Sequence, residues 1–258
     1  MTRSGARAGP LFSIITVVWN RAGTIAHALD SLYAQSFADY EHIAQDGGSL
    51  DGTLALLEAV RDPRMRLVSE RDTGIYDGLN RALARASGDV IGLLHSDDFY
   101  AHADVLAQVA RRFAETGADA VYGDLDYVSS ADPARIVRHW RSGDFDPRAL
   151  KRGWMPPHPA LFLKRAVVEK WGGYDTGFQI AADYDAILRY FGAGGITAAY
   201  LPQVLVKMRM GGASNRSLAR IIRKSCEDYR ALRKNGVGGV GTLLCKNLRK
   251  VAQFYPLA

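Results

Sequence analysis

The first half of the chain repeats one pattern: a short apolar run, a turn, and then a stretch with apolar residues at helical spacing. Residues 12–18 form an uncharged run rich in β-branched side chains, which is typical of a strand covered on both faces. Residues 24–33 follow, with Ile25, Ala28 and Leu32 on one helical face. The pattern predicts strands at 12–18, 41–45, 66–69, 90–94 and from 120, and helices at 24–33, 51–60, 75–86 (closed by Gly88 as a C-cap) and 105–114.

Strands that alternate with helices of about ten residues indicate βαβ units and a mostly parallel α/β sheet, in which ligands bind at the carboxyl ends of the strands. We interpret residues 11–213 as one domain with two halves, 11–125 and 126–213, after a flexible stretch at 1–10. The second half departs from the simple alternation. Its expected elements are a strand at 135–140, a loop at 143–159, a strand leading into a helix at 161–171, a helix at 183–191 and a strand at 198–208 broken by Pro202.

The net charge of +6 is concentrated at the end of the chain. Residues 214–258 carry ten Lys or Arg against two Asp or Glu, whereas residues 1–213 carry 23 against 25. Two amphipathic helices are expected in this basic tail, at 217–234 and 240–255. They either pack back on the body or contact an anionic membrane surface. No nucleic acid is expected as a partner, because no RNA- or DNA-binding module accompanies the charge.

Composition and motifs exclude several classes of protein. No run approaches the ~20 apolar residues that cross a bilayer, and the apolar residues 11–19 lack the cleavage site of a secretion signal. Cys226 and Cys245 make no disulfide framework, so a cytoplasmic setting is the simplest expectation. Neither the GxxxxGK[ST] loop nor the GxGxxG fingerprint is present, which leaves a kinase, a GTPase or a nicotinamide-dependent enzyme without support.

Acidic side chains stand where the expected strands end. Asp97 and Asp98 follow the strand at 90–94, and such a pair either binds Mg²⁺ or Mn²⁺ or forms a turn and helix cap. Asp46 follows the strand at 41–45, where it can accept hydrogen bonds from a base or ribose. Asp183, at the start of a helix, is either an N-cap or a general base that takes a proton from a hydroxyl group.

Taken in order, these segments resemble the large GT-A family of inverting glycosyltransferases, family 2, and most closely its bacterial polysaccharide-assembly members. The resemblance runs from residue 12 to about 213. It is carried by residues 13–16 with 19–20, 46–53, 69–77, Asn80, 87–89, 96–98, 122–124, 172–175, 181–185 and Arg189.

The resemblance implies a GT-A fold with a Rossmann-like sheet, a nucleotide-sugar half at 11–125 and an acceptor half at 126–213. It also implies a UDP- or GDP-sugar donor, Mn²⁺ or Mg²⁺ as cofactor, and a lipid-linked or growing glycan as acceptor. In this interpretation Asp183 is the catalytic base and Asp98 the metal ligand. The donor would be held by Thr16, Val17, Val18, Trp19, Asp46, Gly48, Asp77 and Asp97, and the acceptor side would include Trp154, His158 and Asp185.

Two departures from the family pattern lie near the expected acceptor side. His95 stands where relatives often carry asparagine, and residues 157–159 read Pro-His-Pro where a Cys-His-Gln type of sequence is frequent. Two other functions stay open from the sequence: a catalytically silent binding or assembly protein on the same fold, and a nucleotidyltransferase. If the tail meets a membrane, the protein would lie peripherally on the inner face of the cytoplasmic membrane.

Overall fold

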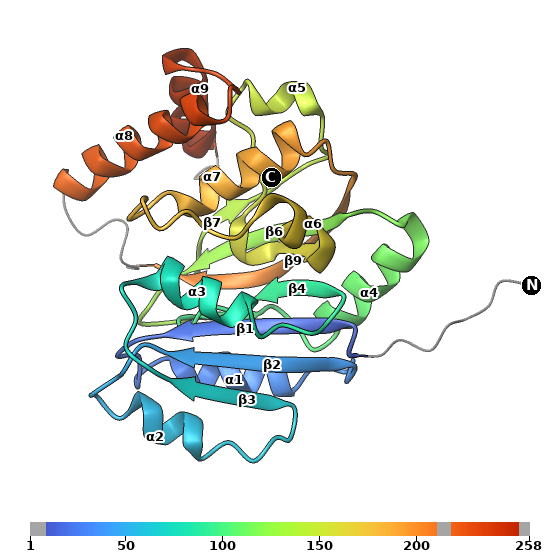
Figure 1. Cartoon of the computed structure of the whole chain (residues 1–258), viewed down its shortest axis with the longest axis vertical. Coiled ribbons are helices and arrows are strands. Elements are labelled where there is room, and N and C mark those ends of the chain that lie inside the picture. The colour runs from blue at the N-terminus through green and yellow to red at the C-terminus, as the bar shows by residue number, and fades with distance from the viewer. Residues whose placement is uncertain (1–8, 211–217, 253–258) are drawn as a thin grey trace, which may run out of the picture.

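The computed structural model describes residues 9–210 and 218–252, which form a curled nine-stranded sheet with helices on both faces (Figure 1). In the view of Figure 1, α3 (Ile75–Leu83) lies in front of the sheet and α1 (Ile25–Tyr33) lies behind it. The strands are β1 (Phe12–Val18), β2 (Tyr40–Asp46), β3 (Met65–Ser69), β4 (Val90–Leu93), β5 (Asp98–Tyr100), β6 (Ala120–Val128), β7 (Ile136–Trp140), β8 (Leu161–Lys164) and β9 (Ala198–Arg209).

Within this sheet the strands follow the order β3-β2-β1-β4-β8-β6-β9-β5, and β7 pairs with β6 outside that path. β1 pairs in parallel with β2 and β4, β2 with β3, and β6 with β9. β8 runs antiparallel to both β4 and β6, while β5 and β7 run antiparallel to β9 and β6. Because β5, β7 and β8 are the strands of opposite direction, the mostly parallel α/β sheet is confirmed.

Helices cover the apolar faces of this sheet. α3 packs on β1 and β2, whereas α4 packs on β6 and β9. The remaining bounds are α2 (Thr53–Glu58), α4 (Val105–Thr116), α5 (Pro147–Leu150), α6 (Arg165–Trp171), α7 (Ala182–Leu188), α8 (Leu218–Lys234) and α9 (Val240–Ala252), with a 3₁₀ turn at His158–Ala160 and a π-helical turn at Arg189–Ala193.

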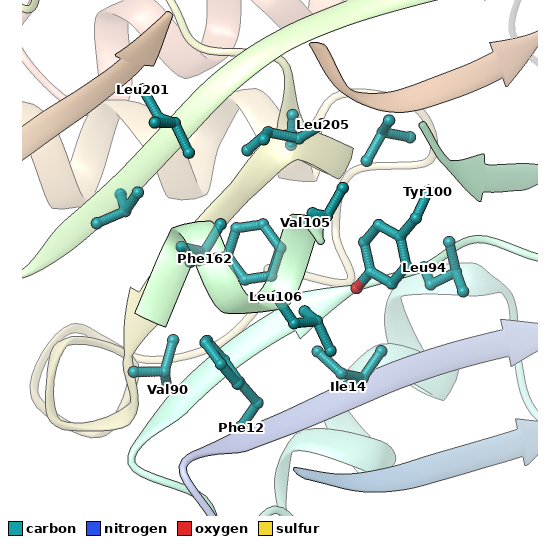
Figure 2. Packing of buried hydrophobic residues seen from close by; sticks show 14 of the residues in the cluster. Phe12, Ile14, Val90, Leu94, Tyr100, Val105, Leu106, Phe162, Leu201 and Leu205 are labelled. Carbon is teal, nitrogen blue, oxygen red and sulfur yellow. The ribbon is translucent and has the colours of Figure 1, made fainter. Parts of the chain in front are cut away.

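One hydrophobic core joins the two halves of the chain. Figure 2 shows Phe12 and Ile14 of β1 beside Leu106 of α4, Phe162 of β8 and Leu205 of β9, and all five are buried. Full burial of a side chain of this size stabilises the fold by about 1.5–3 kcal/mol. The core therefore holds the strand ends of both halves in a fixed relation to each other.

The C-terminal helices α8 and α9 pack on the body. Ala231 and Leu232 of α8 are fully buried in a second core together with Tyr184 of α7. Asp228 of α8 pairs with Lys246 of α9 at 2.8 Å, and both side chains are buried. The described part of the tail therefore packs on the body. Residues 1–8 of the expected flexible start and 253–255 of the expected second helix lie outside the described residues.

None of the helices in the described part of the chain combines the length and the apolar content needed to cross a membrane.

Three local expectations need correction. The sequence analysis missed β5, a three-residue strand whose hydrogen bonds come from β9. Pro202 does not break β9; the strand bulges there instead, since Tyr122 pairs with Tyr200 but Asp124 with Val204. Gly88 is no C-cap, because α3 ends at Leu83. A Cβ at Gly88 would lie 2.6 Å from the β1 backbone, so close packing requires the glycine.

Candidate active site

The loops that follow β1 and β2 are bonded to each other at the edge where the parallel strands end. The Asn20 N–H donates to Ser49 Oγ at 2.8 Å, and Asn20 Oδ1 accepts from the Leu50 N–H at 2.8 Å. Asn20 has φ +52°, a left-handed conformation that asparagine tolerates better than most residues. The next N–H, of Arg21, donates to Thr53 Oγ1 at 2.7 Å. The turn after β1 is therefore fixed against the start of α2.

Asp46, at the end of β2, has one bonded carboxylate oxygen and one unbonded oxygen. Oδ2 accepts from the N–H groups of Gly48 (3.1 Å) and Ser49 (3.0 Å) and from Ser69 Oγ (2.7 Å). Gly48 has φ +80°, which favours glycine in this turn. Oδ1 is buried and has no hydrogen-bond partner among the described residues. An unsatisfied buried acceptor costs about 1–3 kcal/mol, so Oδ1 is suited to accept a hydrogen bond from a ligand.

Asp72 is a second carboxylate at this edge, and the sequence analysis missed it. Its Oδ1 accepts from the Gly74 N–H at 3.0 Å. A Cβ at Gly47 or Gly78 would come within 2.7 or 3.0 Å of its Oδ2. Burial raises the pKa of Asp72, and the Asp46 carboxylate adds to that rise. The two glycines are the sequence signal for this position, because both leave room for the carboxylate.

The residues predicted to hold the donor from β1 differ in their exposure. The side chains of Thr16, Val17 and Val18 are buried, and Thr16 Oγ1 lies 3.1 Å from His42 Nε2 inside the protein. Trp19 is 62% exposed at the carboxyl end of β1. In this group, therefore, Trp19 has the side chain that can contact a ligand, while the other three side chains lie inside the protein.

Asp77, also predicted to bind the donor, is already bonded within its own helix. It accepts from the Thr73 N–H at 3.0 Å and pairs with Arg81 at 3.0 Å. The Arg81 guanidinium lowers the pKa of Asp77. These contacts fit a cap for the first turn of α3.

Asp97 and Asp98 lie where the chain leaves β4 and enters β5. Asp98 is 1% exposed, and neither of its carboxylate oxygens has a hydrogen-bond partner among the described residues. Burial, followed by the Asp97 carboxylate, raises the pKa of Asp98 well above its usual value, and Arg209 opposes the rise. The Arg209 guanidinium donates to the Asp97 carbonyl at 2.9 Å. A buried carboxylate without donors is a group that a cation would stabilise.

Asp183 stands in the first turn of α7 and is half-buried. Within the described residues it has one hydrogen-bond contact, from the Tyr76 hydroxyl to Oδ1 at 3.5 Å. The same hydroxyl donates to the Ile180 carbonyl at 2.6 Å, which ties α3 to the chain just before α7. Asp183 is not the N-cap of α7, because that position is Ala181.

Tyr127 of β6, which the sequence analysis also missed, is aligned with the predicted metal ligand Asp98 across β9. Met208 of β9 is the register partner of both Asp98 and Tyr127, so these three side chains share one face of the sheet. Burial raises the pKa of Tyr127; Arg138 opposes this, and the carboxylates of Asp98 and Asp183 add to it.

His158 lies next to the side chains of Tyr174 and His95. Its Nε2 lies 2.8 Å from the Tyr174 hydroxyl, and its ring centre lies 5.8 Å from that of His95. Burial lowers the pKa of His158 to about 4, and the Asp183 carboxylate only partly offsets the effect. The imidazole is therefore neutral at neutral pH.

Two residues predicted on the acceptor side lie inside the protein instead. Trp154 is buried, and its indole N–H donates to the Ser142 carbonyl at 2.8 Å. Asp185 is fully buried, with Lys234 at 3.0 Å and Asn235 at 2.9 Å from its Oδ1. Residues two apart on a helix point in nearly opposite directions, so α7 turns Asp185 toward α8 and Asp183 away from it. Neither Trp154 nor Asp185 is free to contact an acceptor.

A comparison with known protein families identifies the family of this chain. The family model described as Glycosyl transferase family 2 matches residues 13–171, more than half of the chain. The chain belongs to glycosyltransferase family 2. The matched span of this glycosyltransferase includes Asp46, Asp72 and Asp98, and it ends before α7.

Curated relatives support the same assignment. The family 2 chain is 34% identical to a PGL/p-HBAD biosynthesis glycosyltransferase of Mycobacterium bovis, over 81% of this chain and 80% of the relative. It is 34% identical to an uncharacterized glycosyltransferase of Mycobacterium tuberculosis, over 70% of this chain and 68% of the relative. It is also 28% identical to the succinoglycan biosynthesis protein ExoO of Rhizobium meliloti, over 72% of this chain and 57% of the relative.

Solved structures confirm the fold of this glycosyltransferase. S. aureus TarS 1–349 in complex with UDP-GlcNAc has a TM-score of 0.68 at 17% identity, over 88% of this chain and 65% of that one. The mannosyltransferase PcManGT of Pyrobaculum calidifontis, in complex with GDP-Man and Mn²⁺, has a TM-score of 0.66 at 22% identity, over 92% of this chain and 69% of that one. The expected GT-A fold is thus confirmed.

Proposed function

We propose that this enzyme transfers a sugar from a UDP- or GDP-sugar to a hydroxyl acceptor, with inversion at the anomeric carbon. The observation that carries the proposal is Asp98, a buried carboxylate with no hydrogen-bond partner for either oxygen among the described residues, which follows β4 at the end of the parallel strands where β2 ends in Asp46. Two structures of similar fold contain UDP-GlcNAc and GDP-Man, which supports a nucleotide-diphosphate sugar as the donor.

The nucleotide would lie at the ends of β1, β2 and β3. Asp46 Oδ1 is buried without a partner, and Asp72 presents an oxygen between two glycines. Both are acceptors, suited to N–H groups of a base or O–H groups of a ribose. The exposed Trp19 would cover the base.

A divalent cation, Mn²⁺ or Mg²⁺, fits Asp98. Hard cations prefer carboxylate oxygen and are often held by one or two carboxylates, with substrate phosphates completing the shell. Among the described residues no three His, Cys, Asp or Glu are grouped to hold a metal, so donor phosphates would supply the other ligands. When bound, such a cation neutralises charge on the departing diphosphate. Asp97 would face the donor beside it.

In the transfer step, the Asp183 carboxylate takes the proton of the acceptor hydroxyl. The acceptor oxygen forms a bond to the anomeric carbon while the bond from that carbon to the diphosphate oxygen breaks, and the nucleotide diphosphate leaves with the electron pair. Attack from the side opposite to the leaving group inverts the configuration. A well-placed general base contributes about 10²–10⁴ in rate. The neutral His158 would orient groups on the acceptor side without taking a proton at neutral pH.

The acceptor is proposed to be a lipid-linked or growing surface glycan. The names of two relatives refer to PGL/p-HBAD biosynthesis and to succinoglycan biosynthesis, which supports this class.

The tail supports a peripheral position on the inner face of the cytoplasmic membrane. Within α9 the buried side includes a lysine, while two leucines face outward. Lys246 is 3% exposed, whereas Leu244 is 58% and Leu248 is 69% exposed. These leucines and the exposed Arg249 present an apolar and basic surface that suits anionic lipid.

A donor screen tests the proposal. The purified protein is incubated with UDP- and GDP-sugars, including UDP-GlcNAc and GDP-Man, with Mn²⁺ or Mg²⁺, and nucleotide release and thermal shifts are followed. We expect release from one donor class and its loss on adding EDTA. No release from any donor, with no thermal shift from UDP or GDP, would favour the catalytically silent alternative.

A further inference from the structure

The start of α7, which carries Asp183, is held by a carboxylate from the C-terminal tail. Glu227 of α8 accepts the N–H groups of Gln179 at 3.1 Å, Ile180 at 2.8 Å and Ala181 at 3.0 Å. α7 has no side-chain cap of its own at Ala181. Hydrogen bonds to a charged acceptor are about twice as strong as neutral ones, and three on one carboxylate fix the backbone direction.

The same short segment is also held from the opposite side. The Tyr76 hydroxyl of α3 donates to the Ile180 carbonyl at 2.6 Å, while Glu227 of α8 accepts the Ile180 N–H. The peptide groups two and three residues before Asp183 are therefore held between α3, on the nucleotide side, and α8, in the tail.

A second contact fixes the rotation of α7. Asp185 pairs with Lys234, the last residue of α8, at 3.0 Å and accepts from Asn235, the next residue, at 2.9 Å. Glu227, Ala231 and Lys234 recur at helical spacing, so one face of α8 supplies both contacts. With Asp185 held toward α8, Asp183 is turned to the other side of α7, where it meets the Tyr76 hydroxyl.

We infer that Glu227 is a positioning residue for catalysis: it sets the place of the Asp183 carboxylate, and α8 is thereby part of the catalytic unit. This inference rests on the proposed role of Asp183. It goes beyond the family match, which ends at residue 171 and includes neither helix. It also gives the basic tail a function that does not depend on a membrane.

Glu41 offers a matched control at the other end of the strands, away from Asp46. Its Oε1 accepts from Ser13 Oγ at 2.6 Å and from the N–H groups of Ser87 at 2.6 Å and Gly88 at 3.3 Å. Glu41 and Glu227 thus hold backbone N–H groups in the same way. Glu41 is the second residue of the seven-residue β2, about 17 Å from Asp46 at the other end.

The experiment compares Glu227→Gln, Glu227→Asp and Glu41→Gln in the full-length protein. Amide hydrogen exchange of residues 178–186 measures directly how firmly Glu227 holds these N–H groups. Binding of UDP and GDP measures whether the nucleotide site is intact. Release of nucleotide from the donor found by screening gives kcat and KM. We expect Glu227→Gln to speed exchange at 179–181 and lower kcat about 10–100-fold, since a displacement of ~1 Å can cost 10² in rate. Donor KM and nucleotide affinity should change less than about twofold, and Glu227→Asp should recover part of kcat.

Glu41→Gln should lower the melting temperature while kcat stays within about threefold of wild type. Unchanged kcat in Glu227→Gln despite faster exchange at 179–181 would overturn the inference. Equal losses of kcat and nucleotide affinity would overturn it too, because they indicate general loosening. If Asp183→Asn keeps wild-type turnover, the proposed base is wrong and the positioning role fails with it. In that case the exchange data would still show the cap, which separates the two failures.

Discussion

The carboxylates of two proposed regions differ in their hydrogen bonds: Asp46 and Asp77 at the nucleotide edge, and Asp98 and Asp183 at the reaction centre. At the nucleotide edge, Asp46 accepts three hydrogen bonds on one oxygen, and Asp77 is paired with Arg81. At the reaction centre, Asp98 has no hydrogen-bond partner among the described residues, and Asp183 has one contact of 3.5 Å. In the first region the protein supplies donors or a cation to each carboxylate and leaves only Asp46 Oδ1 without a partner, whereas in the second region both oxygens of Asp98 lack partners among the described residues.

This difference indicates what each region does. A carboxylate held by its own loop keeps a fixed direction, which suits recognition of a donor group on a base or ribose. A buried carboxylate without donors is unstable as an anion, which suits a group that gains a cation with the substrate or takes up a proton during the reaction. The predictions below test this division.

The largest effect is expected at Asp183. Asp183→Asn should lower kcat by about 10²–10⁴, because the amide cannot take the acceptor proton. The affinity for UDP or GDP should stay within about twofold, since the nucleotide edge is separate. Nucleotide release and thermal shifts measure the two quantities. Wild-type turnover in the variant would remove Asp183 from the role of base.

The next effect is expected at Asp98. Asp98→Asn should weaken donor binding in Mn²⁺ by about 10–100-fold, equal to about 1.4–2.8 kcal/mol. Binding measured in EDTA should be the same for variant and wild type, because the amide removes only the part that needs the cation. Isothermal titration with and without Mn²⁺ gives the comparison. An unchanged Mn²⁺ dependence would count against Asp98 as the metal ligand.

A smaller effect is expected at Asp46. Asp46→Asn should weaken nucleotide binding about 5–30-fold, the loss of about 1–2 kcal/mol from one hydrogen bond to a charged acceptor. In contrast to Asp98, the loss should be equal with Mn²⁺ and with EDTA. A loss that disappears in EDTA would show that Asp46 acts through the cation, and the division between the two regions would fail.

The sequence predicted the regular parts of the molecule well, because hydrophobic spacing determines them. The strands ending in Val18, Asp46 and Leu93 and the helix after residue 181 all stand close to their expected bounds. Short elements that depend on a distant partner were missed. β5 exists because β9 supplies its hydrogen bonds, and no local pattern within three residues shows that.

Site residues that directly follow a strand could be predicted from the sequence. Residues whose place depends on strand register or on burial by a distant element could not. Tyr127 enters the site because Met208 aligns it with Asp98 across the sheet. Asp185 lies away from the acceptor side because the end of α8 provides the cation of Lys234 and the next residue provides the amide of Asn235, 49 and 50 residues further along the chain. A charged residue two positions from a base cannot be assigned from sequence alone.

The smallest expected effect is a change of stability with pH, and it tests the reaction centre without substrate. Burial favours the protonated form of Asp98, so its pKa is higher in the folded state than in the unfolded state. The stability that this group contributes is therefore present below its ordinary pKa of about 3.9 and is lost as pH rises through the raised folded pKa. At neutral pH the cation-free wild type is therefore destabilised by the burial of this group. Asp98→Asn, neutral at every pH, should then melt about 2–4 °C higher than wild type in EDTA at pH 7.5, if the cost is about 1 kcal/mol.

The difference in melting temperature should shrink toward pH 4, and Mn²⁺ with UDP or GDP should stabilise wild type alone. Asp46→Asn should show no such gain, because three donors hold that carboxylate. Equal melting of the Asp98 variant and wild type across the pH range would mean that Asp98 is as well satisfied as Asp46, and the contrast between the two regions would be lost.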